Sequence, residues 1–173
     1  MVDTQELIET QRTFRGAMAN LSAAVNVVST DGPYGRAGMT VSAACSVTDT
    51  PPTLLVCVNR SSSSHGAVVA NGRVCVNVLG TDQESLAMHF AGATRVPTFE
   101  RFGEGSWDFD TYGVPVLRDA LASIVGRIVR TTAAGSHTVA FVEVDAVISG
   151  ERRGALVYFQ RRFHHLAAPA LGA

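Results

Sequence analysis

The chain has 173 residues, enough for one domain with a hydrophobic core and too few to expect two. Its formal net charge is −1 and its 14 basic residues are scattered, so no nucleic-acid-binding surface is expected. No apolar run approaches the roughly 20 residues that cross a bilayer, which argues against a membrane protein. Only 17% of the residues are charged, below the roughly 25% of typical soluble domains. This favours a homo-oligomer that hides part of its surface, with a well-packed monomer as the alternative.

The first elements predict a helix followed by a β-hairpin. Residues 4–21 carry apolar side chains at near-helical spacing. Residues 23–30 (AAVNVVST) are rich in β-branched side chains and end at the turn signal DGPYG, so we expect a strand that enters a hairpin. Residues 36–46 are the expected return strand, which DTPP ends. Residues 53–60 (TLLVCVNR) then predict a buried strand.

The middle of the chain predicts two short helices around one strand. GAVVANG indicates a helical turn that ends at Gly72, and residues 73–80 (RVCVNVLG) alternate as a strand does. Thr81, with Glu84 three residues later, has the capping-box pattern and predicts a helix over residues 82–90.

The last third predicts a loop and then three strands. Residues 94–114 show no regular period, and we expect a surface loop with an aromatic anchor at Trp107. Strands are expected over residues 121–132, 137–147 and 154–159, the first two joined by AAGS. Many strands with short connections and few helices argue against a doubly wound parallel sheet and favour an antiparallel barrel with peripheral helices.

Several common sites are absent from the sequence. There is no GxGxxG after a strand, no GxxxxGK[ST], no GxSxG and no HExxH. Cys45, Cys57 and Cys75 form no CxxC pair, and no metal-ligand spacing recurs, so no metal is expected. The amino-terminal segment is acidic and polar, unlike a secretory signal, and a cytoplasmic protein is expected.

Two polar stretches are the candidates for ligand binding. The stretch AGMTVSAACSVTDTPP is built of small side chains and hydroxyls, a surface on which a planar aromatic ring can lie, with Thr40, Ser42 and Ser46 as donors. The stretch NRSSSS follows a strand end and offers hydroxyls and one cation for a phosphate. The alternatives are a tightly packed barrel strand and a solvated loop. His137 follows a turn and is either a ligand-facing donor or plain surface polarity.

The order of these motifs resembles a known family. FRGAM, AAVNVVST, DGPYGRAGMTVSAACSVTDTPPTLLVCVNR, RVCVNVL, FAG, GSH and LVYFQRRFH resemble the short-chain flavin reductases over about residues 14–165. These are the reductase components of two-component flavin monooxygenases. The chain looks closest to two branches, the NADH:FMN reductase of pyrimidine utilisation and the reductase of 4-hydroxyphenylacetate 3-monooxygenase. Ser136 and the SSSSHG segment depart from the usual patterns of these branches.

The resemblance implies a mainly β fold, a Greek-key split β-barrel with peripheral helices, as one domain over residues 1–173. It implies an NADH:flavin oxidoreductase that reduces free FMN or FAD with NADH or NADPH. The reduced flavin would then diffuse to a partner monooxygenase. It also implies a homodimer with the flavin near the subunit interface. This would make the stretch of small residues the bed of the isoalloxazine ring.

The resemblance also assigns roles to individual residues. The wall of the flavin site would comprise Thr40, Val41, Ser42, Ala43, Cys45, Ser46 and Val47. The ribityl-phosphate arm would be held by Asn59, Arg60, Ser61, Ser62 and Ser63. Around these, the resemblance places Phe90 near the flavin tail or the adenine, His137 beside the nicotinamide, and Tyr158 and Arg161 on the closing strand.

Two other functions fit a similar barrel. One is a flavin-binding carrier or sensor without reductase activity, which would retain flavin tightly and oxidise no nicotinamide. The other is an oxidase of the pyridoxamine-phosphate type, against which the sparse Arg and Lys content near a phosphate site argues.

Overall fold

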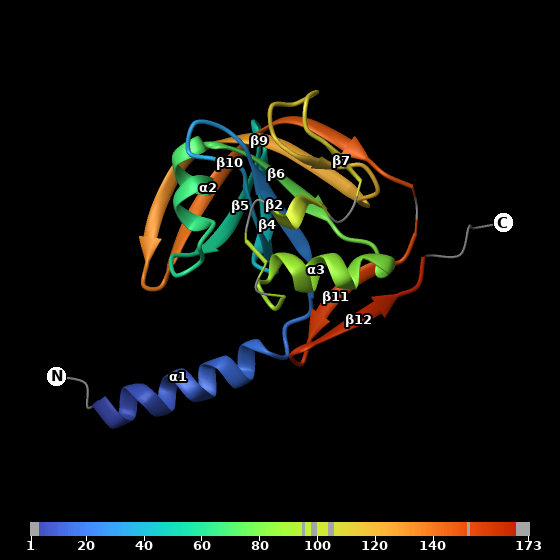
Figure 1. Cartoon of the computed structure of the whole chain (residues 1–173). Helices are drawn as coiled ribbons and strands as arrows, with labels where there is room; N and C mark the ends of the chain where they lie inside the picture. Colours follow the sequence, from blue (N-terminus) through green and yellow to red (C-terminus); the bar gives the residue numbers. More distant parts are fainter. Residues whose placement is uncertain (1–3, 95, 98–99, 104–105, 152, 169–173) are drawn as a thin grey trace.

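The computed structural model describes residues 4–94, 96–97, 100–103, 106–151 and 153–168. Figure 1 shows a barrel of strands with two short helices against it and a third helix projecting from it. The helices are α1 (Thr4–Met18), α2 (His65–Asn71) and α3 (Glu84–Phe90), with 3₁₀ helices η1 (Thr81–Gln83) and η2 (Glu100–Gly103). The strands are β1 (Ala23–Ala24), β2 (Asn26–Thr30), β3 (Ala37–Val41), β4 (Ala44–Asp49), β5 (Pro52–Asn59), β6 (Arg73–Val78), β7 (Trp107–Asp108), β8 (Val116–Leu117), β9 (Ala122–Ala134), β10 (His137–Ser149), β11 (Ala155–Phe159) and β12 (Arg162–Leu166).

The main sheet has seven strands in the order β3-β2-β6-β9-β10-β5-β4, and all its pairs are antiparallel. A second sheet has the order β1-β11-β12, and β7 pairs with β8. The fold is therefore a mainly β split barrel, which confirms the expected fold class. Among the described residues, none of the helices combines the length and the apolar character that crossing a membrane requires.

The core is divided because both faces of the central strands are buried. Val28, Val56, Val76 and Val142 belong to the cluster inside the barrel. A second cluster, which includes Leu79, Phe90, Trp107 and Leu156, lies between the main sheet, α3 and the smaller sheet. Trp107 is 8% exposed, so the expected aromatic anchor is confirmed, although it is buried rather than on a surface loop.

One buried amide ties the loop after β7 to the barrel. The Asn77 side chain donates to the Val27 carbonyl at 3.0 Å and to Ser29 Oγ at 3.1 Å. Its Oδ1 accepts from the Leu117 N–H at 2.9 Å and from Ser123 Oγ at 2.8 Å. Asn77 is fully buried and its amide is satisfied on both sides, so it fixes β2, β8 and β9 in one arrangement.

The expected return strand over residues 36–46 is wrong as one element. The chain bends at Ser42 and Ala43, so β3 and β4 lie at opposite edges of the seven-stranded sheet. β3 pairs with β2, whereas β4 pairs with β5. The small side chains on both sides of the bend give no sequence signal for it, because Ser and Ala suit strand and bend equally well.

Two smaller expectations also need correction. Gln83, not Glu84, reaches back to the start of its helical segment, accepting the Gly80 N–H at 2.9 Å. The segment after Phe159 does not extend the last strand. It turns at Gln160 and Arg161, both of which have positive φ (48° and 61°), and returns as β12. The turn lacks the Gly or Asn that normally announces this geometry.

The three cysteines differ in burial, and this predicts their reactivity. Cys45 is exposed, Cys57 is half-buried and Cys75 is buried. Burial raises the pKa of the Cys75 thiol to about 12, and burial also raises the pKa of the Cys57 thiol. Because the thiolate is the reactive form, we expect iodoacetamide at neutral pH to label Cys45 first and Cys75 only after unfolding. Mass spectrometry of a time course would check this order, and early labelling of Cys75 would contradict the packing of β6.

Candidate functional site

A cavity of about 830 Å³ opens between β3, the loop after β5, α3 and the β11–β12 hairpin. Its volume lies within the roughly 300–1,000 Å³ of small-molecule sites. Elements far apart in the sequence meet here, because β1 pairs with β11 and thereby carries the hairpin alongside the second core. Within the described part of the chain, no group of three or more His, Cys, Asp or Glu side chains is placed to hold a metal ion.

The β3 wall is built by close contacts. Thr40 Oγ1 donates to the Ala87 carbonyl at 2.6 Å, which fastens α3 to β3. A Cβ at Gly38 would lie 2.6 Å from Cε1 of Phe90, so only glycine lets that ring lie against the strand. Ser64 Oγ, fully buried, donates to the Gly38 carbonyl at 2.7 Å. The Thr40 hydroxyl thus donates its proton to the backbone of α3. Ser42 also lines the cavity, and its hydroxyl is the candidate donor to a ligand on this wall.

The serine loop has a defined backbone shape. Asn59 Oδ1 accepts the Ser61 N–H at 3.0 Å and the Ser61 hydroxyl at 2.9 Å. Ser62 Oγ accepts the Ser64 N–H at 3.3 Å, and α2 begins directly afterwards. Such side-chain-to-backbone bonds hold a turn without regular secondary structure. The loop therefore has a defined conformation, with the hydroxyl groups of Ser61, Ser62 and Ser63 at the edge of the cavity.

Cations line the opposite rim. Arg161 and Arg162 lie in and after the β11–β12 turn, and both are exposed at the cavity. Arg101 also lines the cavity, but it is 9% exposed and donates to the carbonyls of Val96 and Phe90, so it is part of the wall. Glu84, at the start of α3, is paired with His165 Nε2 at 2.8 Å. The two exposed guanidinium groups leave this rim suited to an anion.

Nine of the residues that the sequence analysis assigned to the site line the cavity together. They come from β3, the serine loop, α3 and the hairpin, and they are Thr40, Ser42, Asn59, Ser61, Ser62, Ser63, Phe90, Tyr158 and Arg161. Of these, Phe90 is 1% exposed and belongs mainly to the aromatic cluster with Phe102 and Trp107.

Five residues of the expected flavin wall do not line this cavity, four of them because the chain bends after Ser42. Val41 points into the barrel core. Ala43 is exposed, and its carbonyl accepts the Cys57 N–H. Cys45 and Ser46 line a different, apolar groove, and Val47 is 47% exposed.

Arg60 and His137 lie beside the cavity but do not line it. The Arg60 side chain donates to the Gly135 carbonyl at 3.5 Å, and its N–H bonds the Ser136 carbonyl at 2.9 Å. His137 begins β10 opposite Asn59, so the two side chains share a face of the sheet. The His137 ring nitrogen Nδ1 lies 3.0 Å from Ser136 Oγ. Arg60, the cation expected from the serine stretch, therefore does not line the cavity. The exposed cations at the cavity are Arg161 and Arg162 of the β11–β12 hairpin.

Sequence reasoning missed half of the lining. The missed residues come from the segment between β1 and β2, from β3, α3 and its end, η2 and β12, and they are Val25, Met39, Glu84, Met88, Ala91, Gly92, Arg101, Arg162 and Phe163. The FAG and RRF strings carry a signal for some of them, since Ala91, Gly92, Arg162 and Phe163 are neighbours of expected residues. The others depend on packing between distant segments.

This fold and cavity agree with one family. The profile of the flavin reductase like domain matches residues 18–167, and the chain belongs to this family. It is 48% identical over 163 residues to the 4-hydroxyphenylacetate 3-monooxygenase reductase component of Pseudomonas aeruginosa, covering 94% of this chain and 96% of that protein. It is 53% identical over 156 residues to the FMN reductase (NADH) RutF of Variovorax paradoxus, covering 90% and 86%.

Solved structures show the same fold. BorF, the flavin reductase component of a bacterial two-component tryptophan halogenase, superposes with a TM-score of 0.84 at 30% identity. The alignment covers 92% of this chain and 99% of that one. The family resemblance and both branches suggested by the motifs are thereby confirmed.

Proposed function

We propose that the protein is an NADH:flavin oxidoreductase that reduces free FMN or FAD at the 830 Å³ cavity. The observation that carries this is the pairing of one uncharged rim of small residues with a second rim of cations inside a flavin reductase fold. Relatives with 53% and 48% sequence identity are named as an FMN reductase (NADH) and as a monooxygenase reductase component, respectively.

The cavity residues fit a flavin. Ser42, Ala91 and Gly92 are small enough to leave a flat space for the ring. Ser61, Ser62 and Ser63 offer hydroxyls for a ribityl chain, and Arg161 and Arg162 offer the charge that a phosphate requires. A flavin held by these residues would supply the hydride-accepting N5, and the nicotinamide C4 would be the hydride donor. The protein's part is to hold the two rings stacked about 3–3.5 Å apart and to exclude water.

The direct test is anaerobic reduction. Purified protein mixed with NADH and an excess of FMN or FAD should bleach the visible absorbance of the flavin over many turnovers. NADPH and pyridoxamine phosphate are run in parallel. Flavin that stays bound through gel filtration with no nicotinamide oxidation would instead indicate a carrier or sensor. Absence of bleaching with either flavin and either nucleotide would overturn the proposal.

We expect His137→Ala to raise the Michaelis constant for NADH roughly three- to tenfold, the worth of one ordinary hydrogen bond, while flavin affinity changes little. The reason is position, since His137 lies beside Asn59 at the cavity edge rather than in its lining. Ser136→Ala, which removes the hydroxyl at 3.0 Å from the ring, is the control for an indirect effect. A collapse of flavin affinity with unchanged NADH kinetics would show that His137 contacts the flavin and not the nicotinamide.

The partners follow from the chemistry. A reductase that holds its flavin with hydroxyls and two exposed cations binds it moderately, so the reduced flavin can leave for a flavin-dependent monooxygenase. We further propose that the chain acts in the cytoplasm, as a single domain, and as a homodimer. The low charged share of 17% supports the homodimer.

A further inference from the structure

His65 is a half-buried histidine beside the cavity that does not line it. It is the first residue of α2 and directly follows the serine loop, residues 60–64. Its Nε2 lies 2.9 Å from Thr138 Oγ1, a hydrogen bond in which the tautomer of the ring decides which atom donates. Thr138 is 8% exposed and follows His137 at the start of β10. The pair therefore joins the end of the serine loop to the strand that carries His137.

Two other bonds fasten the same loop. The Arg60 N–H donates to the Ser136 carbonyl at 2.9 Å, so the loop begins against the β9–β10 turn. Ser64 Oγ donates to the Gly38 carbonyl at 2.7 Å and holds the loop to β3. Of these three bonds, that of His65 is the one that joins two side chains. A substitution can therefore remove it and leave the backbone hydrogen bonds of the loop in place.

The helix that follows the loop does not need this bond to stay on the barrel. Val68 of α2 is 1% exposed and packs in the cluster inside the barrel. Burial of such a side chain stabilises the contact between helix and barrel without fixing a direction. A hydrogen bond adds direction, because it weakens steeply when its geometry changes. The bond between His65 and Thr138 is therefore suited to setting where the end of the loop lies.

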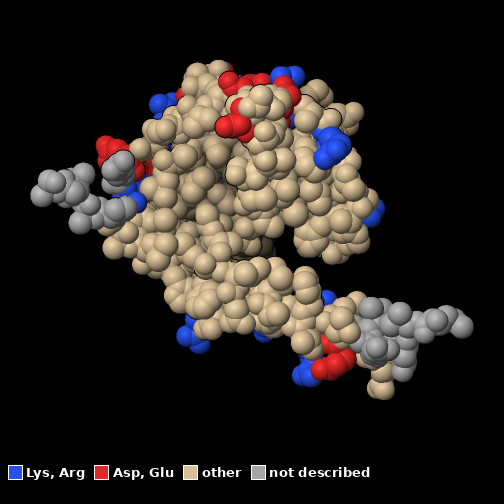
Figure 2. Space-filling view, turned by 180° about the vertical axis from the view of Figure 1, so that it is seen from behind, with Lys and Arg blue, Asp and Glu red and all other residues tan. Residues whose placement is uncertain are grey.

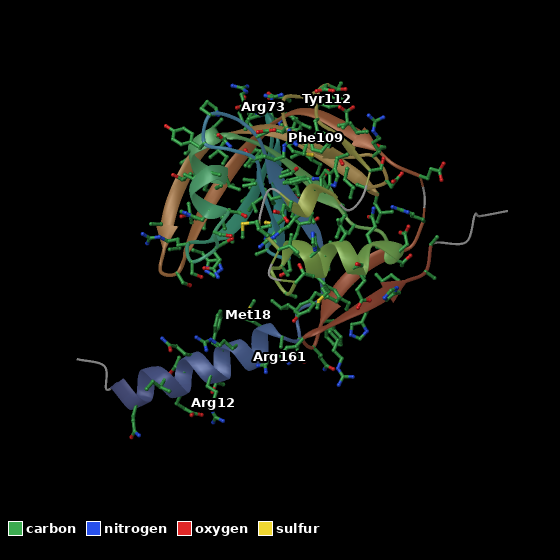
Figure 3. All side chains as sticks on the ribbon, viewed as in Figure 1. Arg12, Met18, Arg73, Phe109, Tyr112 and Arg161 are labelled. Carbon is green, nitrogen blue, oxygen red and sulfur yellow. The ribbon has the colours of Figure 1, made fainter. Side chains whose placement is uncertain are left out.

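The loop contributes hydroxyl groups to the cavity and no charge. Ser61, Ser62 and Ser63 line it, and Figure 2 shows a hollow between α1 and the barrel whose walls are largely uncharged. Figure 3 shows Arg161, a cation of the other rim, at the turn of the β11–β12 hairpin and away from α2. Charges act over several ångströms, whereas hydroxyls must lie within about 3 Å of their partners. What the serines contribute to binding therefore depends on the placement of the loop.

We propose that His65 is a positioning residue for the flavin. Through its bond to Thr138 it holds the serine loop where the hydroxyls of Ser61, Ser62 and Ser63 bond the ribityl chain. It touches neither the flavin nor the nicotinamide. This inference rests on the proposed function and deepens it, because it assigns recognition of the chain, as distinct from the ring, to the placement of one loop.

The first test compares three flavins that share the ring and differ at N10. Lumiflavin carries a methyl group there, riboflavin the ribityl chain, and FMN the chain with its phosphate. Removing one hydrogen bond with His65→Phe should raise the Michaelis constants for riboflavin and FMN about three- to tenfold and leave that for lumiflavin within about twofold. Steady-state kinetics at saturating NADH measures all three. Equal increases for the three flavins, an increase for FMN alone, or none for FMN would overturn the inference.

The second test breaks the same bond from the other strand. Thr138→Val should give the same difference between the flavins, so the inference can be tested even if His65→Phe does not fold. Thr131→Val is the matched control, since Thr131 is exposed on β9 and outside the cavity lining. His65→Gln, whose amide can reach the hydroxyl, should restore near wild-type constants. A glutamine variant that behaves as His65→Phe does would contradict the hydrogen bond as the cause.

The double variant His65→Phe with Thr138→Val separates positioning from stability. It leaves no buried hydroxyl unpaired at this contact, so its free energy of unfolding should return close to the wild-type value. The raised Michaelis constants for riboflavin and FMN should persist, because the directional bond is still absent. Recovery of these constants together with stability would show a purely structural role and would overturn the inference.

Binding without turnover separates this inference from the proposed function. If the wild type reduces no flavin, the reductase proposal fails, and equilibrium dialysis of FMN and lumiflavin makes the same comparison. An FMN dissociation constant about three- to tenfold higher in His65→Phe, with that of lumiflavin unchanged, would support the positioning role on its own. Equal changes for both ligands would overturn it. A wild-type protein that binds neither flavin would overturn both proposals.

Discussion

Replacing Ser42 with phenylalanine should raise the Michaelis constant for flavin roughly 10- to 100-fold while the protein stays folded. Ser42 directly follows β3 at the bend to β4, and it lines the cavity with an exposed side chain. A phenyl ring there competes with the flavin ring for the same space. Overfilling a packed space costs about 1–3 kcal/mol, and each 1.4 kcal/mol corresponds to a factor of ten in affinity.

Ser149→Phe is the matched control. Ser149 is an exposed serine at the end of β10 and does not line the cavity, so the same change there should leave the kinetics unaltered. Steady-state kinetics with varied FMN and saturating NADH measures both variants. Equal Michaelis constants in Ser42→Phe and wild type would show that the ring does not lie on the β3 wall.

Asn77→Ala should lower the free energy of unfolding by about 3–4 kcal/mol, which is the largest loss of stability we expect from a single substitution outside the cavity. The change leaves the buried Val27 carbonyl, the Leu117 N–H and the Ser123 hydroxyl without the amide that now bonds them. Each buried group left unpaired costs about 1–3 kcal/mol, partly offset where a neighbour or water substitutes.

Urea unfolding followed by circular dichroism measures this loss. Asn20→Ala is the control, since Asn20 is exposed and its bonds to Gly16 and Gln160 lie in water. Its expected loss is under about 0.5 kcal/mol. A loss below about 1 kcal/mol for Asn77→Ala would mean that the loop carrying β8 is held by other contacts.

The sequence allowed the elements to be predicted where local period and turn chemistry are strong. The strand expected over residues 73–80 appears as β6, and the Gly72 stop of α2 appears as well, since Gly72 adopts a positive φ of 70° that glycine favours. The bend after Ser42 was not predictable, because its cause is sheet topology. The edge strands β3 and β4 are separated by five other strands that the local sequence does not order.

The site was predictable only in part for the same reason. Ser42, the serine loop and Arg161 were found from motifs, and they do meet at one cavity. Cys45 and Ser46 line a different groove, and a single strand assumed across the bend could not separate them from Ser42. Arg162 was missed because the turn at Gln160 and Arg161 has no glycine to mark it, so the hairpin looked like a continuous strand.

The most direct measurement of flavin placement uses the sequence's single tryptophan. Trp107 packs against Phe90 with ring centroids 5.6 Å apart, and Phe90 lines the cavity. Tryptophan emission overlaps flavin absorption, so FMN bound in the cavity should quench Trp107 fluorescence in a saturable titration, and Ser42→Phe should shift that titration to higher FMN concentration. Quenching that shows no saturation, or that is identical in Ser42→Phe, would contradict a flavin site at this cavity.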